Sequence, residues 1–287
     1  MRAHQGREVR RVRTLFISDV HIGCRHAQAE AFLDFLSEIW PERLYIVGDF
    51  VDGWRLRRSW SWSPTYNRIL SRVMQLAEMG TQVYYCPGNH DNFLRSFPAL
   101  AEISKSYHFL EIADEFVCEL ADGRRFAVIH GDQFDCIERS AQWLSVFNAF
   151  VYDQVLSLNW WLSRGLGIDD RSPYWLCAII KDRVKRAIQF AQRFEASLLQ
   201  FARERSCEGV ICGHIHTPTI RHNDGLTYCN IGDWIENCTA LVEDEDGTLK
   251  LSRYFSATSE PPQDQAEPDW EPAESATAHC TPLTPTG

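Results

Sequence analysis

The chain lacks paired cysteine motifs, long apolar runs and an excess of basic residues, and each absence excludes a class of protein. Its ten cysteines include no Cys-x-x-Cys pair, which favours free thiols in a reducing compartment over a disulfide framework. No uninterrupted apolar run approaches the roughly 20 residues needed to span a bilayer. The net charge is −10, so general binding to nucleic acid is not expected.

The two ends of the chain differ in composition from its centre. Residues 1–13 are charged and contain no apolar segment typical of a signal peptide, so we expect a flexible basic N-terminus and a cytoplasmic protein. Residues 256–287 are rich in Pro, Glu, Thr, Ser and Ala, which predicts a disordered tail. Residues 14–255 remain as one domain, and a hydrophobic content of 45% is sufficient for a core.

Short apolar runs alternate with amphipathic patterns in the first part of the domain. The runs at 14–18, 44–47 and 82–86 are typical of strands, and the patterns at 27–39 and 65–79 are typical of helices. Strands separated by helices usually pair in parallel. The sequence therefore predicts an α/β fold with parallel strands in its first half.

The second part of the domain changes character twice. Residues 107–120 and 125–129 suggest strands joined by an Asp122-Gly123 turn. From about 138 to 205 the strand signal disappears and apolar residues recur at helical spacing, so we expect a helical insertion. Strands resume at 209–212, and four further strands are expected to close the fold as an antiparallel set at 219–221, 226–230, 240–243 and 249–255.

Five polar motifs directly follow predicted strands. In α/β folds, ligands bind at the carboxyl ends of strands. Two residues separated by one other residue on extended backbone share a face, which we expect within the first motif and within the last. Mixed carboxylate, imidazole and amide groups suit Mn²⁺, Fe²⁺ or Zn²⁺. The motifs are Asp19-x-His21, Gly48-Asp49, Gly88-Asn89-His90-Asp91, His130-Gly131-Asp132 and Gly213-His214-x-His216.

These motifs, in this order across residues 14–233, resemble those of the calcineurin-like metallophosphoesterase family. The resemblance implies a four-layer α/β/β/α sandwich of two mixed sheets, with the helical insertion over the active-site edge. It also implies hydrolysis of a phosphate ester or pyrophosphate with two divalent cations, most often Mn²⁺. His90 would be the catalytic histidine, oriented by Asp91. One cation would be held by Asp19, His21, Asp49 and His216, and the other by Asp49, Asn89, His130 and His214.

A closer resemblance is to UDP-2,3-diacylglucosamine pyrophosphatases and their paralogues. It is carried by the segments at 19–23, 48–54 and 231–234 and by the helical insertion. It implies a lipid-linked nucleotide sugar as substrate, cleaved to UMP and a lipid 1-phosphate. The best-studied branch has arginine where this chain has His90. Two alternatives therefore stay open: another phosphate substrate, soluble or lipid, or an inactive metal-bound scaffold that binds proteins.

Residues beside the motifs are candidates for substrate binding. Trp54 and Arg55 are two such candidates. Arg55 could meet a diphosphate, since a guanidinium fork matches phosphate oxygens, or the two side chains could simply stack in a solvated loop. Arg95 follows the Asn89 motif closely enough to reach the substrate. Asp52 is expected to support a ligand histidine.

The helical insertion carries its own aromatic candidates. Phe147 and Phe150 are expected to cover an acyl pocket or to pack on the sheet. Trp160 and Trp161, with Arg164 nearby, resemble a patch that contacts a membrane surface. The sequence does not predict an oligomeric state.

Overall fold

The computed structural model describes residues 9–95, 109–134 and 175–254. The expectations for residues 1–8, for the tail and for most of the helical insertion, including Phe147, Phe150, Trp160 and Trp161, lie outside these ranges. Among the described helices, none is both long enough and apolar enough to cross a bilayer. Seven cysteines, those whose side chains the structure describes, are unpaired thiols.

The first sheet has six strands in the order β11-β10-β1-β2-β3-β4. Strands β1 to β4 are parallel, and β10 runs antiparallel to both β1 and β11. This sheet is therefore mixed, as predicted. Its strands are β1 (Arg10–Ile17), β2 (Ile39–Val47), β3 (Gln82–Cys86), β4 (Leu110–Ile112), β10 (Thr239–Glu243) and β11 (Leu249–Arg253).

The second sheet has five strands in the order β5-β6-β7-β9-β8. Strands β6, β7 and β9 are parallel, and the edge strands β5 and β8 are antiparallel to their neighbours. The chain crosses between the sheets after β4 and again after β9, so the four closing strands do not form one set as predicted. The strands are β5 (Glu115–Glu119), β6 (Arg125–Ile129), β7 (Gly209–Cys212), β8 (Thr219–Asn223) and β9 (Leu226–Asn230).

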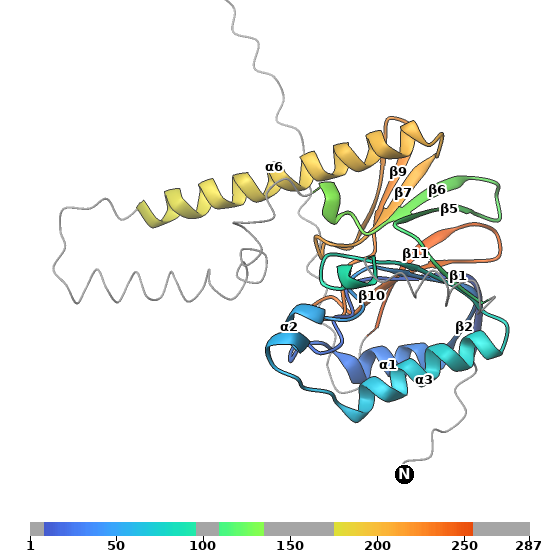
Figure 1. Ribbon diagram of the computed structural model, residues 1–287. Coiled ribbons are helices and arrows are strands. Elements are labelled where there is room, and N and C mark those ends of the chain that lie inside the picture. The colour runs from blue at the N-terminus through green and yellow to red at the C-terminus, as the bar shows by residue number, and fades with distance from the viewer. Residues whose placement is uncertain (1–8, 96–108, 135–174, 255–287) are drawn as a thin grey trace, which may run out of the picture. The chain divides into compact units, whose positions relative to one another are not determined.

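Helices cover the outer faces of both sheets (Figure 1). Helices α1 (Ala29–Glu38) and α3 (Pro64–Glu78) lie against the first sheet, and the C-terminal half of α6 (Trp175–Glu204) lies against the second. A short helix, α2 (Gly53–Arg58), joins β2 to α3, and 3-10 turns form at η1 (Asn92–Leu94) and η2 (Asp132–Phe134).

The alternation of apolar residues along the strands produces three separate cores. In β1, Leu15 and Ile17 face α1 and α3, whereas Phe16 faces the second sheet. In β6, Phe126 and Val128 face the first sheet, and the intervening Ala127 faces α6. Successive strand side chains point to opposite faces, so each sheet is buried on both sides. The predicted four-layer α/β/β/α sandwich is confirmed.

The first strand starts earlier than expected. Residues 10–13 were predicted to be flexible because they are basic, but they pair with β2 from Arg10 onward. The positive charges have local partners: Arg10 Nη2 lies 2.6 Å from Asp244 Oδ1, and the Arg11 guanidinium lies 4.9 Å from the centre of the Trp40 ring. Neighbouring groups thus offset charges that the sequence pattern alone suggests are solvated.

We expect Phe126→Ala to lower the free energy of unfolding by about 3–5 kcal/mol, since it leaves a cavity in the core between the sheets. The Phe126 side chain is fully buried there. Val117→Ala, on the same hairpin but 44% exposed, is a matched control with an expected loss below about 1 kcal/mol. Urea unfolding measures both. Equal losses would contradict the assigned core.

Candidate metal centre and active site

The loops that follow β1 and β2 run side by side and bring three motif residues together. The Asp19 amide donates to the Gly48 carbonyl at 3.1 Å, and the His21 amide donates to the Asp49 carbonyl at 2.9 Å. A parallel bridge between Ile22 and Val51 continues the pairing. Because β1 and β2 are parallel neighbours, their carboxyl ends place Asp19 and His21 beside Asp49.

The backbone at these residues is not extended, so the explanation predicted for the Asp-x-His and His-x-His spacing is wrong. A left-handed backbone is sterically unfavourable for residues other than glycine and costs about 1–3 kcal/mol per residue. Such strain is typical of functional sites. The left-handed residues in the motifs are Asp19 (φ 52°), His21 (φ 51°), Asp49 (φ 50°), His214 (φ 70°) and His216 (φ 51°).

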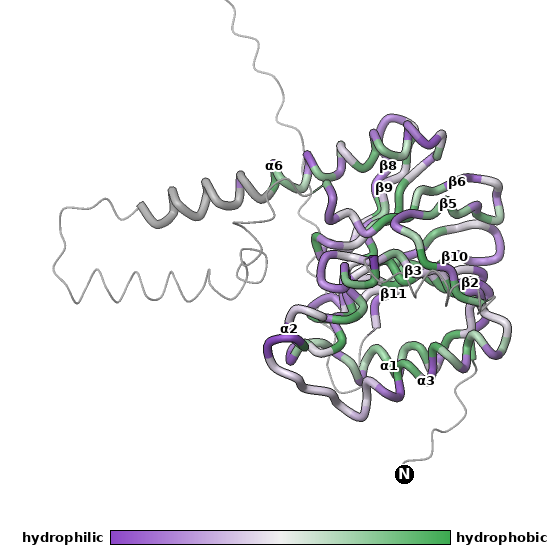
Figure 2. Tube along the Cα trace, in the orientation of Figure 1, coloured by the Kyte–Doolittle hydropathy of each residue, from purple (hydrophilic) through white to green (hydrophobic). Residues whose placement is uncertain are grey.

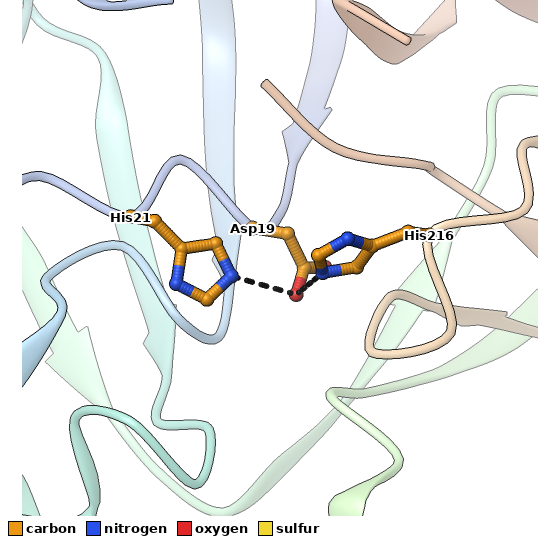
Figure 3. Close-up of side chains that lie close together, drawn as sticks. All are labelled: Asp19, His21 and His216. Carbon is orange, nitrogen blue, oxygen red and sulfur yellow. Dashed lines mark hydrogen bonds and ion pairs between the residues drawn. The ribbon is translucent and has the colours of Figure 1, made fainter. Parts of the chain in front are cut away.

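One group of side chains centres on Asp19 (Figure 3). His216 Nε2 lies 3.1 Å from Asp19 Oδ1, and His21 Nε2 lies 3.7 Å from the same oxygen. One ligand atom from each of the three residues lies within 4.8 Å of the others. The first motif and the last therefore share one potential cation site.

A second group centres on Asp49. His130 Nε2 lies 3.4 Å from Asp49 Oδ2, and one ligand atom each from Asp49, His130 and His214 lies within 4.8 Å of the others. His130 Nδ1 is hydrogen-bonded to the Val47 carbonyl at 2.9 Å, which fixes the ring with Nε2 toward Asp49. His214 and His216 thus belong to different groups rather than to one face.

Asp49 and His21 connect the two groups. His21 Nε2 lies 3.9 Å from Asp49 Oδ2, and His21, Asp49 and His90 form a further set of ligand atoms within 4.8 Å. Six of the seven residues for which the resemblance implies metal binding are therefore neighbours. The seventh, Asn89, is placed beside them by its backbone, because the amide of the next residue, His90, donates to Asp49 Oδ1 at 2.8 Å.

Three buried side-chain atoms of this centre indicate that it suits divalent cations. His21 Nε2, Asn89 Oδ1 and His130 Nε2 are buried without a hydrogen-bond partner among the described residues. Buried polar atoms are almost always paired, and an unpaired one calls for a ligand or an ion. Imidazole nitrogens, an amide oxygen and carboxylates together suit first-row divalent metals. The centre can therefore hold divalent cations.

The electrostatics of the centre also favour the binding of cations. Burial alone would raise the pKa of the Asp19 and Asp49 carboxyls, but nearby imidazoles lower both below the usual range. Burial alone would lower the pKa of His130, yet Asp49 raises it to about 10, and Asp19 likewise raises the pKa of His216 to about 9. The carboxylates thus require positive charge, and cations that take this role would displace protons from the imidazoles.

Two motif glycines are needed because other groups approach their backbone closely. A Cβ on Gly88 would lie 2.3 Å from Asp49 Oδ1, and a Cβ on Gly213 would lie 1.9 Å from Ser18 Oγ. Real Cβ atoms do not make such contacts. The glycines therefore allow the strand ends to approach the Asp49 and Asp19 carboxylates.

His90 is held at the rim of the centre by three groups. Its Nδ1 is hydrogen-bonded to Asp52 Oδ1 at 3.0 Å, and its ring stacks on Trp54 at 4.2 Å and meets the His21 ring edge-on at 4.7 Å. Burial alone would lower the pKa of His90, but the Asp52 hydrogen bond and the Asp49 carboxylate raise it. His90 is therefore favoured as a proton donor.

Asp91 does not hold His90 as expected. Its carboxylate accepts hydrogen bonds from the Tyr85 hydroxyl at 2.6 Å, the Gly88 amide at 2.6 Å and the Phe50 amide at 2.9 Å. Asp52 orients His90 instead, and its other oxygen lies 4.0 Å from His21 Nδ1. Asp91 is next to His90 in the sequence, but the turn directs its side chain to Tyr85 and the Gly88 amide instead of His90.

The predicted substrate-binding residues differ in whether their side chains are free to contact a substrate. Arg95 donates to both Asp132 oxygens at 2.8 and 3.1 Å, to Asp114 at 3.1 Å and to the Pro87 carbonyl at 2.6 Å. This guanidinium therefore has a structural role that the sequence did not predict. Arg55 remains 56% exposed, and Trp54, 40% exposed, presents its free surface beside His90.

The turn after β9 supports the Asp19 group in a way that sequence reasoning missed. The Trp234 amide donates to the Asp19 carbonyl at 3.0 Å, and Asn237 Nδ2 donates to the His216 carbonyl at 3.0 Å. The turn is held by Asp233 Oδ1, which accepts from the amides of Ile235 at 2.8 Å and Glu236 at 2.6 Å. The Gly-Asp-Trp motif at 232–234 was the one available signal, whereas no pattern marks Asn237.

Comparisons with known proteins agree with this geometry. Residues 12–218 match the family model described as calcineurin-like phosphoesterase. A UDP-2,3-diacylglucosamine hydrolase of Haemophilus influenzae (strain PittGG) is 25% identical over 254 residues, covering 81% of this chain and 95% of that protein. The enzyme of the same name from Aeromonas salmonicida (strain A449) is 27% identical over 245 residues, covering 80% and 89%. The matched range contains all seven candidate ligands.

We expect Asn237→Ala to weaken one cation site selectively. Loss of a group that orients a ligand typically lowers metal affinity 10- to 100-fold, and Asn237 holds the left-handed backbone of His216. Titration of the metal-stripped chain with Mn²⁺, followed by calorimetry, should show one site weakened and the other retained. Asn223→Ala, at an exposed position of β8, is the control. Equal weakening of both sites, or of neither, would contradict the assigned role.

Proposed function

The chain belongs to the calcineurin-like phosphoesterase family and is a metal-dependent phosphoester hydrolase, and we propose that it cleaves a pyrophosphate in a lipid-linked nucleotide sugar of the UDP-2,3-diacylglucosamine type. The observation that carries the hydrolase chemistry is the position of Asp49 between two groups of ligands. The substrate is supported by the relatives, which are named UDP-2,3-diacylglucosamine hydrolase and are similar over most of their length.

In this proposal Asp49 would serve both of two cation sites. Asp19, His21 and His216 would complete one site, and Asn89, His130 and His214 would complete the other. When bound, such a pair of cations lowers the pKa of a coordinated water and offsets the charge of the phosphate. The mixture of carboxylate, imidazole and amide donors favours Mn²⁺, with Fe²⁺ or Zn²⁺ as alternatives.

The residues of the chain provide orientation and a proton. Water oxygen forms a new bond to phosphorus and loses a proton to solvent while the bond to the leaving oxygen breaks. His90 donates a proton to that oxygen or, where the leaving group is itself a phosphate, stabilises its negative charge. Asp52 keeps Nδ1 of His90 engaged at 3.0 Å, so Nε2 is the nitrogen that faces the substrate. For the proposed substrate, one water is consumed, and the products are UMP and 2,3-diacylglucosamine 1-phosphate.

The substrate contacts in this proposal come from the loop after β2. Trp54 and Arg55 lie directly after Asp52, and Arg55 Nε is 3.7 Å from Asp52 Oδ2. A guanidinium in this position can meet a phosphate oxygen, and the exposed edge of Trp54 can contact the sugar or base. Arg95 has no substrate role in the proposal because its donors are engaged by Asp132, Asp114 and Pro87.

We expect Asp52→Asn to lower kcat more strongly for substrates with basic leaving groups. General acid catalysis typically contributes 10²- to 10⁴-fold, and a weakly basic leaving group such as p-nitrophenolate needs little protonation. The loss should therefore be about 10²-fold or more with diphenyl phosphate and much smaller with bis-p-nitrophenyl phosphate. Both rates are measured with Mn²⁺, and Asp49→Ala, which removes the shared carboxylate, gives the background.

Asp91→Asn is the matched comparison for this test. It removes an adjacent carboxylate that holds the turn but does not contact His90, so any loss should be similar for both substrates. If Asp91→Asn instead gives the loss that depends on the leaving group, and Asp52→Asn does not, the assigned role of Asp52 is wrong.

We expect the chain to release UMP faster from a UDP-2,3-diacylglucosamine than from the same molecule without its acyl groups. The acyl groups add apolar surface, and burying it contributes about 25 cal/mol per Å². Chromatography of UMP at equal, low substrate concentrations compares the two values of kcat/KM. A preference for the deacylated molecule would exclude the lipid substrate and leave a phosphodiesterase for soluble substrates.

A further inference from the structure

Helix α2 and the residues after it form an exposed patch of arginines and tryptophans, of which the proposed hydrolysis uses only Trp54 and Arg55. We call residues 54–60 the α2 patch. Trp60 is 75% exposed, and Arg57 and Arg58 are exposed as well. From Gly53 to Ser63 there is no acidic residue, in a chain whose net charge is −10. Figure 2 shows α2 as one of the strongly hydrophilic segments.

The structure holds Trp60 outward rather than letting it pack into the core. Its ring stacks on Trp62 at a centroid distance of 5.8 Å and an angle of 14°. Trp62 is fixed in turn, because its Nε1 donates to Asn67 Oδ1 at 2.8 Å and its ring packs edge-on against Tyr66 at 5.4 Å. The Ser63 side chain caps α3 directly afterwards. The exposed Trp60 indole thus stacks on a ring that is itself held by a hydrogen bond and an aromatic contact.

We propose that the α2 patch docks the protein on a bilayer surface that contains anionic lipid. Indole rings are enriched at the depth of lipid headgroups, and each arginine near an anionic surface contributes about 1 kcal/mol. The patch presents both groups together. Its positive charge is local in an otherwise acidic chain, so attraction to an anionic surface orients the molecule with this patch toward the lipid.

This surface is continuous with the catalytic residues. Trp54, the first residue of the patch, stacks on His90 at 4.2 Å, and Asp52 caps the start of α2 by accepting from the Arg55 amide at 3.0 Å. Docking through the patch would therefore place the metal centre at the lipid surface. That consequence rests on the proposed function, since it matters for a lipid-bearing substrate, whereas docking itself does not depend on hydrolysis.

A single phosphate of the substrate is the other anion that the arginines could bind. A side chain that is three-quarters exposed and supported from behind suits a broad planar partner better than one phosphate group. The two partners differ in their consequences: loss of a membrane contact leaves turnover of a small soluble substrate unchanged, and loss of a substrate contact lowers it.

Sedimentation of the full-length chain with sucrose-loaded vesicles tests the proposal. The vesicles are made of phosphatidylcholine alone or with 30 mol% phosphatidylglycerol, and the chain should bind the second kind only. Arg57→Ala/Arg58→Ala should lower the partition coefficient about 30-fold, the equivalent of two arginines at about 1 kcal/mol each. Trp60→Ala should also lower the partition coefficient, both at low and at high salt.

Matched controls separate this surface from charge in general. Arg193→Ala/Arg203→Ala removes two arginines from α6, and Met74→Ala removes another exposed apolar side chain; neither should change vesicle binding. Hydrolysis of bis-p-nitrophenyl phosphate without vesicles should be unaltered in all variants. The proposal is overturned if the wild type does not bind anionic vesicles, if the α2 variants bind as the wild type does, or if they lose soluble-substrate turnover.

Discussion

A single buried carboxylate, that of Asp49, is the group on which the site depends. Its Oδ2 lies 3.9 Å from His21 Nε2 and 3.4 Å from His130 Nε2, and its backbone is left-handed at φ 50°. An unpaired buried carboxylate is strongly unfavourable, so this position is stable only when positive charge surrounds it. The neighbouring imidazoles supply that charge in the chain alone, and two cations would supply it in the enzyme.

The two sheets contribute different parts of the centre, which explains why the fold must close as it does. The first sheet provides Asp19, His21, Asp49 and Asn89 from the ends of β1, β2 and β3, and the second provides His130, His214 and His216 from the ends of β6 and β7. In the proposed function neither sheet alone would hold a cation, because each supplies only part of the set of ligands. The apolar core between the sheets therefore sets the spacing between the two parts of the set, and the turns at the strand ends hold their residues in left-handed conformations.

Much of the fold and of the candidate site could be predicted from the sequence. Strand β3 and helix α3 follow directly from apolar periodicity, and the five motifs identify the residues that converge. The partner of His90 could not be predicted: Asp91 is adjacent in sequence, but the turn directs it to Tyr85 and Gly88, and Asp52 comes from another loop. The division of the last four strands between two sheets also depends on packing, which local patterns do not encode.

Side-chain contacts between distant segments were the other feature that could not be predicted from the sequence. Arg95 is close to the site in sequence, yet Asp132 and Asp114 engage its guanidinium, and Asn237 orients His216 through a hydrogen bond between distant segments. Such partners depend on tertiary structure. The same holds for the basic start of β1, where Asp244 and Trp40 offset charges that looked solvated.

Anomalous diffraction from crystals of the full-length chain grown with Mn²⁺ is the most direct measurement of the central claim. We expect two anomalous peaks about 3.5–4 Å apart, one beside Asp19 and His216, the other beside His130 and His214, with one Asp49 oxygen contacting both. A single peak, or two peaks neither of which contacts Asp49, would contradict it.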